Sequence, residues 1–239
     1  MSYLYHTFFY EPLYNGLIFV ISILPHWADF GVAIVLFTVI VKLILYPLSR
    51  KSVVSQMKMK ELEPRINEIK AQYKEPAEQS MQTMKLYKEM GINPFSSILL
   101  VFIQIPIILA LYRLFYNGGL PHIDTALLYS FVHAPEVVTM KLWFIDITKK
   151  SWELALLAAG TQFFQIKYSM PVTKKDPAAA PSFGTDLAHA MSTQMKYVLP
   201  VIVFFASYSI NAGIAIYWTT SNVFAIGQEL FIRRKNGKK

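Results

Sequence analysis

Apolar residues in this chain are gathered into long runs, and shorter polar segments separate these runs. Runs of roughly 18 or more apolar residues are typical of transmembrane helices, because about 20 residues cross a hydrocarbon core of about 30 Å. The pattern therefore predicts an all-α polytopic membrane protein with five transmembrane helices. The predicted spans are residues 28–48, 95–116, 151–170, 195–209 and 213–232.

The segments between the spans differ in composition. Within residues 1–27, the apolar stretch Leu13–Leu24 is short for a span, and we interpret it as an extracytoplasmic interfacial helix, with a sixth span as the alternative. Residues 49–94 place apolar side chains at helical spacing on both sides of Pro76, which predicts an antiparallel helical hairpin. Pro64 should kink or divide the first arm of this hairpin. Three further segments complete the chain: a mixed polar extracytoplasmic segment at 117–150, a mobile Pro/Ala/Ser-rich cytoplasmic loop at 171–194, and a basic tail at 233–239.

Basic residues are distributed unevenly between these segments. The hairpin carries nine Lys and Arg residues and the tail five, whereas residues 117–150 carry only Lys141, Lys149 and Lys150. Since basic loops stay in the cytoplasm, the hairpin and the C-terminus should be cytoplasmic and the N-terminus outside. The predicted location is the cell inner (plasma) membrane. The net charge of +8 is then a topology signal, and we expect no DNA partner.

Motifs for covalent chemistry are missing from the sequence. There is no cysteine, no HExxH, no GxSxG and no phosphate-binding loop, and all five histidines fall outside the predicted spans. We therefore expect no enzyme activity, no cofactor and no metal site.

Lys42 is a basic residue inside the first predicted span. It lies six residues before Leu48, about 9 Å from the cytoplasmic end of the helix. A charge at the centre of a span costs about 2.5–3.5 kcal/mol on insertion scales and usually marks a function. The alternative is that the long side chain reaches the headgroups by snorkelling.

Other polar side chains fall at a similar depth in the remaining spans, and none of them is acidic. Polar groups in lipid need partners or water, so these residues either form interhelical hydrogen bonds or line a hydrated groove. A cation among neutral polar groups favours a groove that is open to the cytoplasm and receives something negative. The predicted lining is Gln104, Gln162, Gln165, Thr219 and Asn222.

The hairpin is rich in methionine. Flexible thioethers suit varied apolar contacts, so a substrate-receiving surface is one interpretation and packing between the two arms is the other. The residues concerned are Met57, Met59, Met81 and Met84.

Several segments of this sequence, in order and over nearly the whole chain, resemble the YidC/Oxa/Alb membrane protein insertases. They are Pro12–Gly16, Ile40–Leu48, Met57–Arg65, Leu86–Pro94, Gln104–Ile107, Ala110–Tyr112 and Tyr217–Asn222. The resemblance implies a hydrophilic groove with a basic residue at Lys42, where relatives usually have arginine. It also implies a hairpin that helps to receive substrate and a tail that can contact the ribosome, and the large extracytoplasmic domain of some bacterial members is not expected here.

The predicted function is that of a membrane protein insertase or chaperone. It would move nascent apolar segments from the cytoplasm into the lipid bilayer without nucleotide, with the ribosome and a Sec-type translocon as further candidate partners. Two alternatives stay open on the sequence: a small-anion transporter or channel, and a membrane receptor or assembly scaffold.

Overall fold

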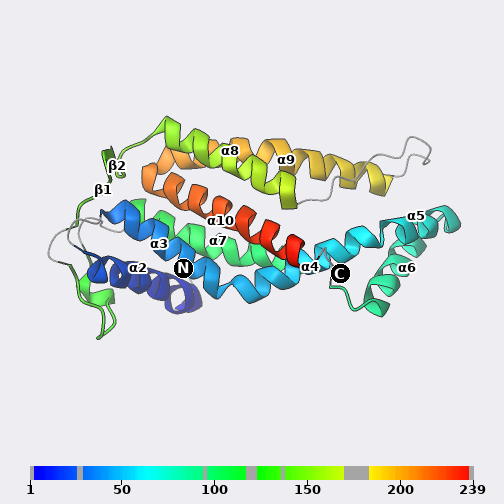
Figure 1. The fold of residues 1–239 in the computed structure, drawn as a ribbon, viewed down its shortest axis with the longest axis horizontal. Coiled ribbons are helices and arrows are strands. Elements are labelled where there is room, and N and C mark those ends of the chain that lie inside the picture. The colour runs from blue at the N-terminus through cyan, green and yellow to red at the C-terminus, as the bar shows by residue number, and fades with distance from the viewer. Residues whose placement is uncertain are drawn as a thin grey trace.

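The computed structural model describes residues 3–25, 29–93, 96–116, 123–135, 138–169 and 183–236. Its helices lie roughly along one long axis (Figure 1). At one end, α5 (Glu63–Gln72) and α6 (Pro76–Glu89) project beyond the other helices, and we call this the hairpin end. The opposite end carries the described parts of residues 123–150, and we call it the loop end.

The helical bundle is organised around α10 (Ala212–Asn236). This helix packs against α3 (Phe30–Ile44) and α4 (Tyr46–Glu61), and also against α8 (Trp152–Ser169). α8 in turn packs against α9 (Phe183–Ile210), while α7 (Ser96–Tyr116) packs against α4. Apart from one two-stranded sheet, the regular secondary structure of the described residues is helical, which confirms the all-α class.

The N-terminal segment folds into α1 (Tyr3–Tyr5), the π-helix η1 (His6–Tyr10) and α2 (Glu11–Ile23). Leu17 and Ile18 of α2 are fully buried in the main core cluster, together with Ile34 of α3. A Cβ added to Gly16 would lie 2.8 Å from Cε2 of Phe37, so the close approach of α2 to α3 requires glycine there. The predicted N-terminal helix therefore exists, and its place at the membrane surface stays a prediction.

The first predicted span is interrupted earlier than its expected end at Leu48. α3 ends at Ile44, α4 begins at Tyr46, and the two helices meet at an angle of 63°. Pro47 lies in the first turn of α4, where its missing N–H costs no hydrogen bond and its fixed φ suits a helix start. The proline therefore begins a new helix at the bend.

The predicted division at Pro64 is confirmed, since α4 ends at Glu61 and α5 begins at Glu63. α5 and α6 pack against each other over a small buried cluster of Leu62, Leu86 and Ile92. After α6, Gly91 has a φ of +63°, and the N–H of Ile92 donates to the carbonyl oxygen of Tyr87 at 2.8 Å. This is the Schellman arrangement that ends helices, and it places Ile92 back against the cluster.

The second half of the predicted loop at 171–194 is helical, while the predicted start of the fourth span at 195 stays a prediction and lies next to the start of the apolar stretch Gln194–Ile210. α9 already begins at Phe183, so residues 183–194 are helical, while residues 171–182 lie outside the described part. This stretch contains good helix formers such as Leu187, Ala188 and Ala190, and its polarity does not oppose a helix. In the same way, α10 continues to Asn236, so the first residues of the predicted tail are helical; residues 237–239 lie outside the described part.

Helix length and apolar composition give a limited picture of the spans. Among the described residues, no single helix has both the length and the apolar composition of a membrane span, and α3 with α4 meets that standard only as a bent pair. Shorter apolar stretches are Ile103–Phe115 and Gln194–Ile210. The number of spans stays a prediction.

The loop end is tied to the helices by specific hydrogen bonds. The Asn15 side chain donates to the carbonyl oxygen of Leu127 in η2 (Thr125–Leu127) at 2.8 Å and accepts from the N–H of Tyr129 at 2.7 Å. Strands β1 (Lys141–Leu142) and β2 (Ile145–Asp146) pair in antiparallel register. Just before β1, the carbonyl oxygen of Thr139 accepts from the N–H of Phe30, at the start of α3, at 3.0 Å. This segment therefore fixes where α3 begins.

Candidate functional site

Lys42 of α3 lies next to polar side chains from two other helices. Its Nζ donates to Oε1 of Gln104 in α7 at 3.3 Å, and Nε2 of Gln104 donates to the hydroxyl oxygen of Tyr217 in α10. Lys42 and Gln104 are half-buried, whereas Tyr217 is buried. We call Lys42, Gln104 and Tyr217 the groove triad, after the groove that the sequence predicts. It joins the three helices at one point between the hairpin end and the loop end.

The cation of the groove triad is held by a neutral amide. In the part of the chain that the structure describes, the ion pairs are His6–Glu11, Lys149–Asp146 and Arg233–Glu229, and none of these includes Lys42. A half-buried ammonium without a carboxylate partner is costly in an apolar environment. The site is therefore complementary to a negative group or to water.

A second polar network runs along the contact between α8 and α10. Nε1 of Trp218 donates to Oε1 of Gln162 at 3.2 Å, and Nε2 of Gln162 donates to Oε1 of Gln165 at 3.1 Å. Nε2 of Gln165 donates to Oγ of Ser169 at 3.0 Å, and this hydroxyl donates to Oε2 of Glu229. These hydrogen bonds connect the middle of the bundle to the hairpin end of α8.

Glu229 is 3% exposed and is neutralised within this network. Nε and Nη2 of Arg233 donate to its Oε1 at 3.0 Å and 2.7 Å. We call Trp218, Gln162, Gln165, Ser169, Glu229 and Arg233 the α8–α10 seam. Because its carboxylate is paired with Arg233, Glu229 is not a counter-ion for Lys42.

The groove lining predicted from helix depth is thus divided between two faces of α10. Gln104 lies with Lys42, whereas Gln162 and Gln165 belong to the α8–α10 seam. Asn222 also faces α8, since its Nδ2 donates to the carbonyl oxygen of Ala158 at 3.4 Å and to Oγ1 of Thr161 at 3.3 Å.

The azimuth around α10 explains the division. Trp218, Asn222, Glu229 and Arg233 are separated by four, seven and four positions, so they share one helix face. Tyr217 is rotated by about 100° from Trp218 and faces α7. Thr219 is half-buried, and its hydroxyl oxygen has no hydrogen-bond partner among the described residues. Tyr217 is missing from the predicted lining, although it lies two positions before the polar run Thr219–Asn222 of α10.

One further hydrogen bond joins α10 to α4 nearer the hairpin end. Nε2 of Gln228 in α10 donates to Oγ of Ser49 in the first turns of α4. This hydrogen bond joins α10 to the helix that follows the bend at Leu45.

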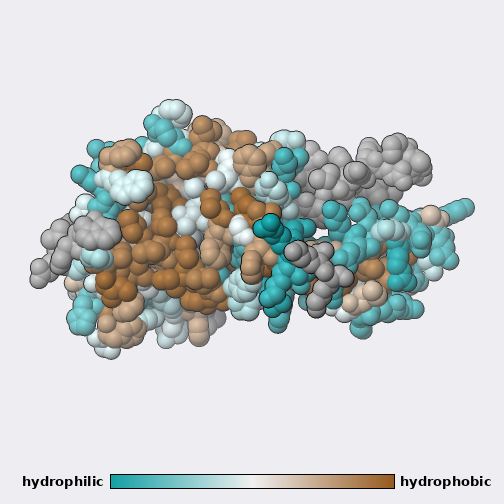
Figure 2. Space-filling view, viewed as in Figure 1, coloured by the Kyte–Doolittle hydropathy of each residue, from teal (hydrophilic) through white to brown (hydrophobic). Residues whose placement is uncertain are grey.

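The hairpin methionines occupy two environments. Met81 and Met84 of α6 are exposed, at 62% and 44%, while Met57 and Met59 of α4 are half-buried. Met59 packs against the cluster of Leu62, Leu86 and Ile92, so it helps to hold the arms together. Figure 2 shows a hydrophilic surface over much of the hairpin end and a mainly apolar surface over the rest of this face. The exposed methionines are therefore apolar side chains in a polar region.

The described residues contain no group of three or more His, Cys, Asp or Glu side chains that could hold a metal ion.

Comparison with known protein families agrees with this arrangement. A family model described as 60Kd inner membrane protein matches residues 22–239. The chain belongs to the 60Kd inner membrane protein family. This membership assigns the chain to the inner membrane, embedded in the bilayer.

Curated relatives in this family are called membrane protein insertase YidC. The chain is 33% identical to the protein from Wolinella succinogenes over 236 residues, which is 98% of this chain and 38% of that protein. It is also 33% identical to the protein from Clostridium tetani over 212 residues, covering 88% of this chain and 84% of that protein. The chain therefore spans well under half of the first relative and most of the second.

One solved structure shares both the fold and the sequence pattern. It is described as an active YidC insertase crystal structure with the first transmembrane domain resolved, and the match has a TM-score of 0.58 at 26% identity. The match covers 91% of this chain and 45% of that chain. The helical fold described above is thus the fold of part of a known insertase.

Proposed function

We propose that this chain is a membrane protein insertase and chaperone that moves nascent apolar segments from the cytoplasm into the bilayer. The observation that carries the proposal is the bond of the Lys42 ammonium to neutral Gln104, with no ion pair to Lys42 among the described residues. The names of the relatives support the same activity. A transient guest with a negative flank would supply the missing counter-charge.

The groove triad accounts for the movement of a substrate from the cytoplasm into the bilayer. Lys42 attracts the polar, often acidic, flank of a substrate partway into the bilayer, and Gln104 and Tyr217 offer it hydrogen-bonding groups there. This shortens the apolar barrier that the flank must cross. The apolar segment of the substrate then moves into lipid along α7 and α10. Burial of that segment is favourable by itself, so neither nucleotide nor covalent catalysis is required.

The topology that fits this function places the N-terminus outside and the C-terminus in the cytoplasm, with five spans. The basic character of the hairpin and of the end of α10 supports this orientation. A cytoplasmic hairpin would present Met81 and Met84 to incoming apolar segments. The basic residues at the end of α10 would contact the ribosome, and a Sec-type translocon would be a neighbour in the membrane.

The test is insertion into liposomes that contain only the purified chain and lipid. The substrate is a purified single-span protein with an acidic flank, presented without ribosomes. Lys42→Glu should reduce insertion to the level of empty liposomes, because the introduced carboxylate repels the flank. Lys42→Arg should retain it, because the charge is kept.

Lys235→Glu serves as the matched control, since Lys235 is exposed at the end of α10 and the assay contains no ribosome. It should insert substrate as the unchanged chain does. Equal insertion by Lys42→Glu and the unchanged chain would exclude the groove charge as the driving feature. Measurement of small-anion flux through the same liposomes separates this function from that of a transporter.

A further inference from the structure

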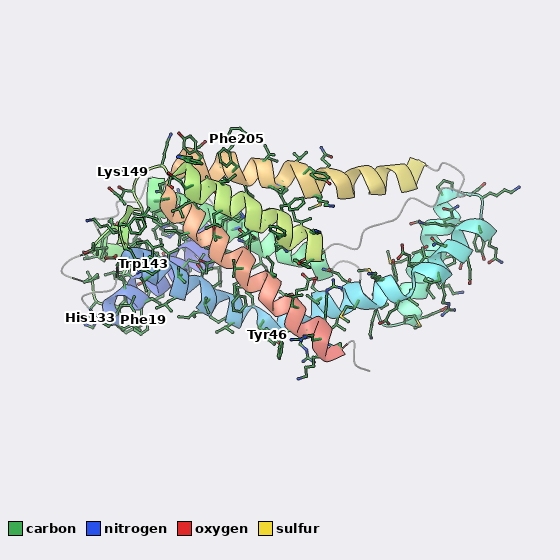
Figure 3. The ribbon with its side chains drawn as sticks, turned by 45° about the horizontal axis from the view of Figure 1, so that its top comes forward. Phe19, Tyr46, His133, Trp143, Lys149 and Phe205 are labelled. Atoms are coloured by element: carbon green, nitrogen blue, oxygen red, sulfur yellow. The ribbon has the colours of Figure 1, made fainter. Side chains whose placement is uncertain are left out.

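The turn between β1 and β2 exposes two large apolar side chains at the loop end. Trp143 is 77% exposed and Phe144 is 87% exposed, and together they form the whole connection between the paired residues Leu142 and Ile145. We call Trp143 and Phe144 the tip. Figure 3 shows Trp143 at the loop end, with Phe19, His133 and Lys149.

The backbone at the tip is in an unfavourable conformation for its residue. Trp143 has a φ of 55°, in the left-handed region where bulky residues are rare. The first position of two-residue hairpin turns usually holds Gly, Asn or Asp for this reason. The turn itself does not require a tryptophan at such a position, so the side chain is a candidate for a role outside the fold of the turn.

The tip is held rigidly and at a definite level. The N–H of Trp143 donates to Oδ2 of Asp29 at 2.9 Å, and Asp29 directly precedes α3. A Cβ added to Gly31 would lie 2.5 Å from Cβ of Leu142, so β1 is pressed against the first turn of α3. The tip therefore lies at the level where the apolar helix α3 begins.

Further exposed aromatic side chains lie on other elements. Phe19 of α2 and Phe131 of the segment before β1 are exposed and form an edge-to-face pair with ring centroids 6.5 Å apart. Trp152 at the start of α8 is 59% exposed. Aromatic residues gather in this way at the boundary between lipid tails and headgroups.

Three lysine residues lie close to the tip in the sequence. Lys141 at the start of β1 is exposed, and so are Lys149 and Lys150 after β2. Lys149 pairs with Asp146 at 3.4 Å, and Nζ of Lys150 lies 5.8 Å from the centroid of the Tyr208 ring. Exposed basic residues close in sequence to two exposed apolar rings complement a surface with phosphate above acyl chains. A protein partner would need a larger continuous apolar patch than two adjacent side chains provide.

We propose that the tip is an anchor that inserts Trp143 and Phe144 into the headgroup boundary of the outer leaflet and thereby fixes the depth of α3. Lys42 lies twelve residues after Phe30, about 18 Å along the helix. A fixed outer end therefore holds the groove charge at a constant distance from the outer surface. This inference uses the membrane location of the chain and the orientation proposed above, and it is independent of the insertion activity.

The absence of cysteine from the chain allows a direct test on the full protein. Phe144→Cys is labelled with a nitroxide in vesicles of phosphatidylethanolamine and phosphatidylglycerol. Electron paramagnetic resonance then measures the collision rates of the label with oxygen, which concentrates in lipid, and with a water-soluble nickel complex. Phe205→Cys on the exposed apolar surface of α9 serves as the lipid reference, and Ser80→Cys on α6 serves as the water reference.

The anchor predicts a several-fold lower nickel collision rate at position 144 than at position 80, and an oxygen collision rate close to that at position 205. Trp143→Gly, which suits the positive φ and leaves the fold intact, should raise the nickel rate at 144 toward the value at 80. A label at 144 as accessible to nickel as the label at 80 would overturn the proposal. So would shielding from both reagents, which would indicate a protein partner, or an unchanged nickel rate in Trp143→Gly.

Discussion

Arg233 neutralises the buried carboxylate of Glu229, and its replacement by methionine tests whether the α8–α10 seam depends on that charge pair. Methionine keeps much of the volume and the apolar stem of arginine but removes both donors to Oε1 of Glu229. The hydroxyl of Ser169 would then be the remaining hydrogen-bond donor to the carboxylate among the contacts described.

The expected loss follows from the burial of the two partners. Removing one member of a fully buried pair costs about 3–5 kcal/mol, because the other charge is left uncompensated. The Arg233 side chain is 30% exposed, so water already screens part of this interaction, and Ser169 still donates. We therefore expect a loss of about 2–3 kcal/mol, which for a chain of this size lowers the melting temperature by about 4–12 °C.

Thermal unfolding of the purified chain in detergent measures this loss. The neighbouring exposed Arg234 provides the matched control, and Arg234→Met should change the melting temperature little. Adding Glu229→Gln to Arg233→Met should recover part of the stability, because the buried charge is removed with its partner. Equal melting temperatures for Arg233→Met and Arg234→Met would refute the assignment of the seam as a charge-dependent contact.

Three further changes test other contacts. Gly31→Ala should destabilise the chain by about 1–3 kcal/mol, because the added Cβ would lie 2.5 Å from Cβ of Leu142 in β1. Gly160→Ala in α8 is the control in the same unfolding assay and should be neutral or stabilising, because nothing lies within 4 Å of the added Cβ. Asn15→Leu should cost about 2–4 kcal/mol, because it leaves two backbone groups of the loop end without their partner, and faster proteolysis of residues 123–135 should accompany it. Gln228→Leu removes the hydrogen bond to Ser49 and should broaden the spin-label distance distribution between α4 and α10; an unchanged distribution would contradict a role for this bond in holding the bend.

The sequence predicted the features that depend on distance along a helix. Pro64 divides the hairpin as expected, and Lys42 and Gln104 meet because their depths match. The position of a residue along a helix does not show in which direction its side chain points around the helix. Gln162 and Asn222 therefore share a predicted lining with Lys42, although they face α8. Which side of a helix lines the site depends on which helices are its neighbours, and the sequence does not show these neighbours.

Other features were hidden because local signals were ambiguous or missing. The predicted first span runs through to Leu48, whereas Pro47 begins the next helix after a bend. The strand pair at Lys141–Asp146 carries none of the glycine or asparagine that usually marks a tight hairpin, since Trp143 adopts the positive φ instead. The helix α9 begins at Phe183, twelve residues before the predicted span, because its first turns are too polar to be part of a predicted span.

The two faces of α10 have a consequence for how such a protein can diverge. Two adjacent residues of this helix contact different neighbours, since Tyr217 accepts a hydrogen bond from Gln104 of α7 and Trp218 donates one to Gln162 of α8. Under the function proposed above, substitutions on the α7-facing side would change which substrates are accepted without altering the contact with α8. In such an insertase, substrate range and structural stability would be separately adjustable through a single helix.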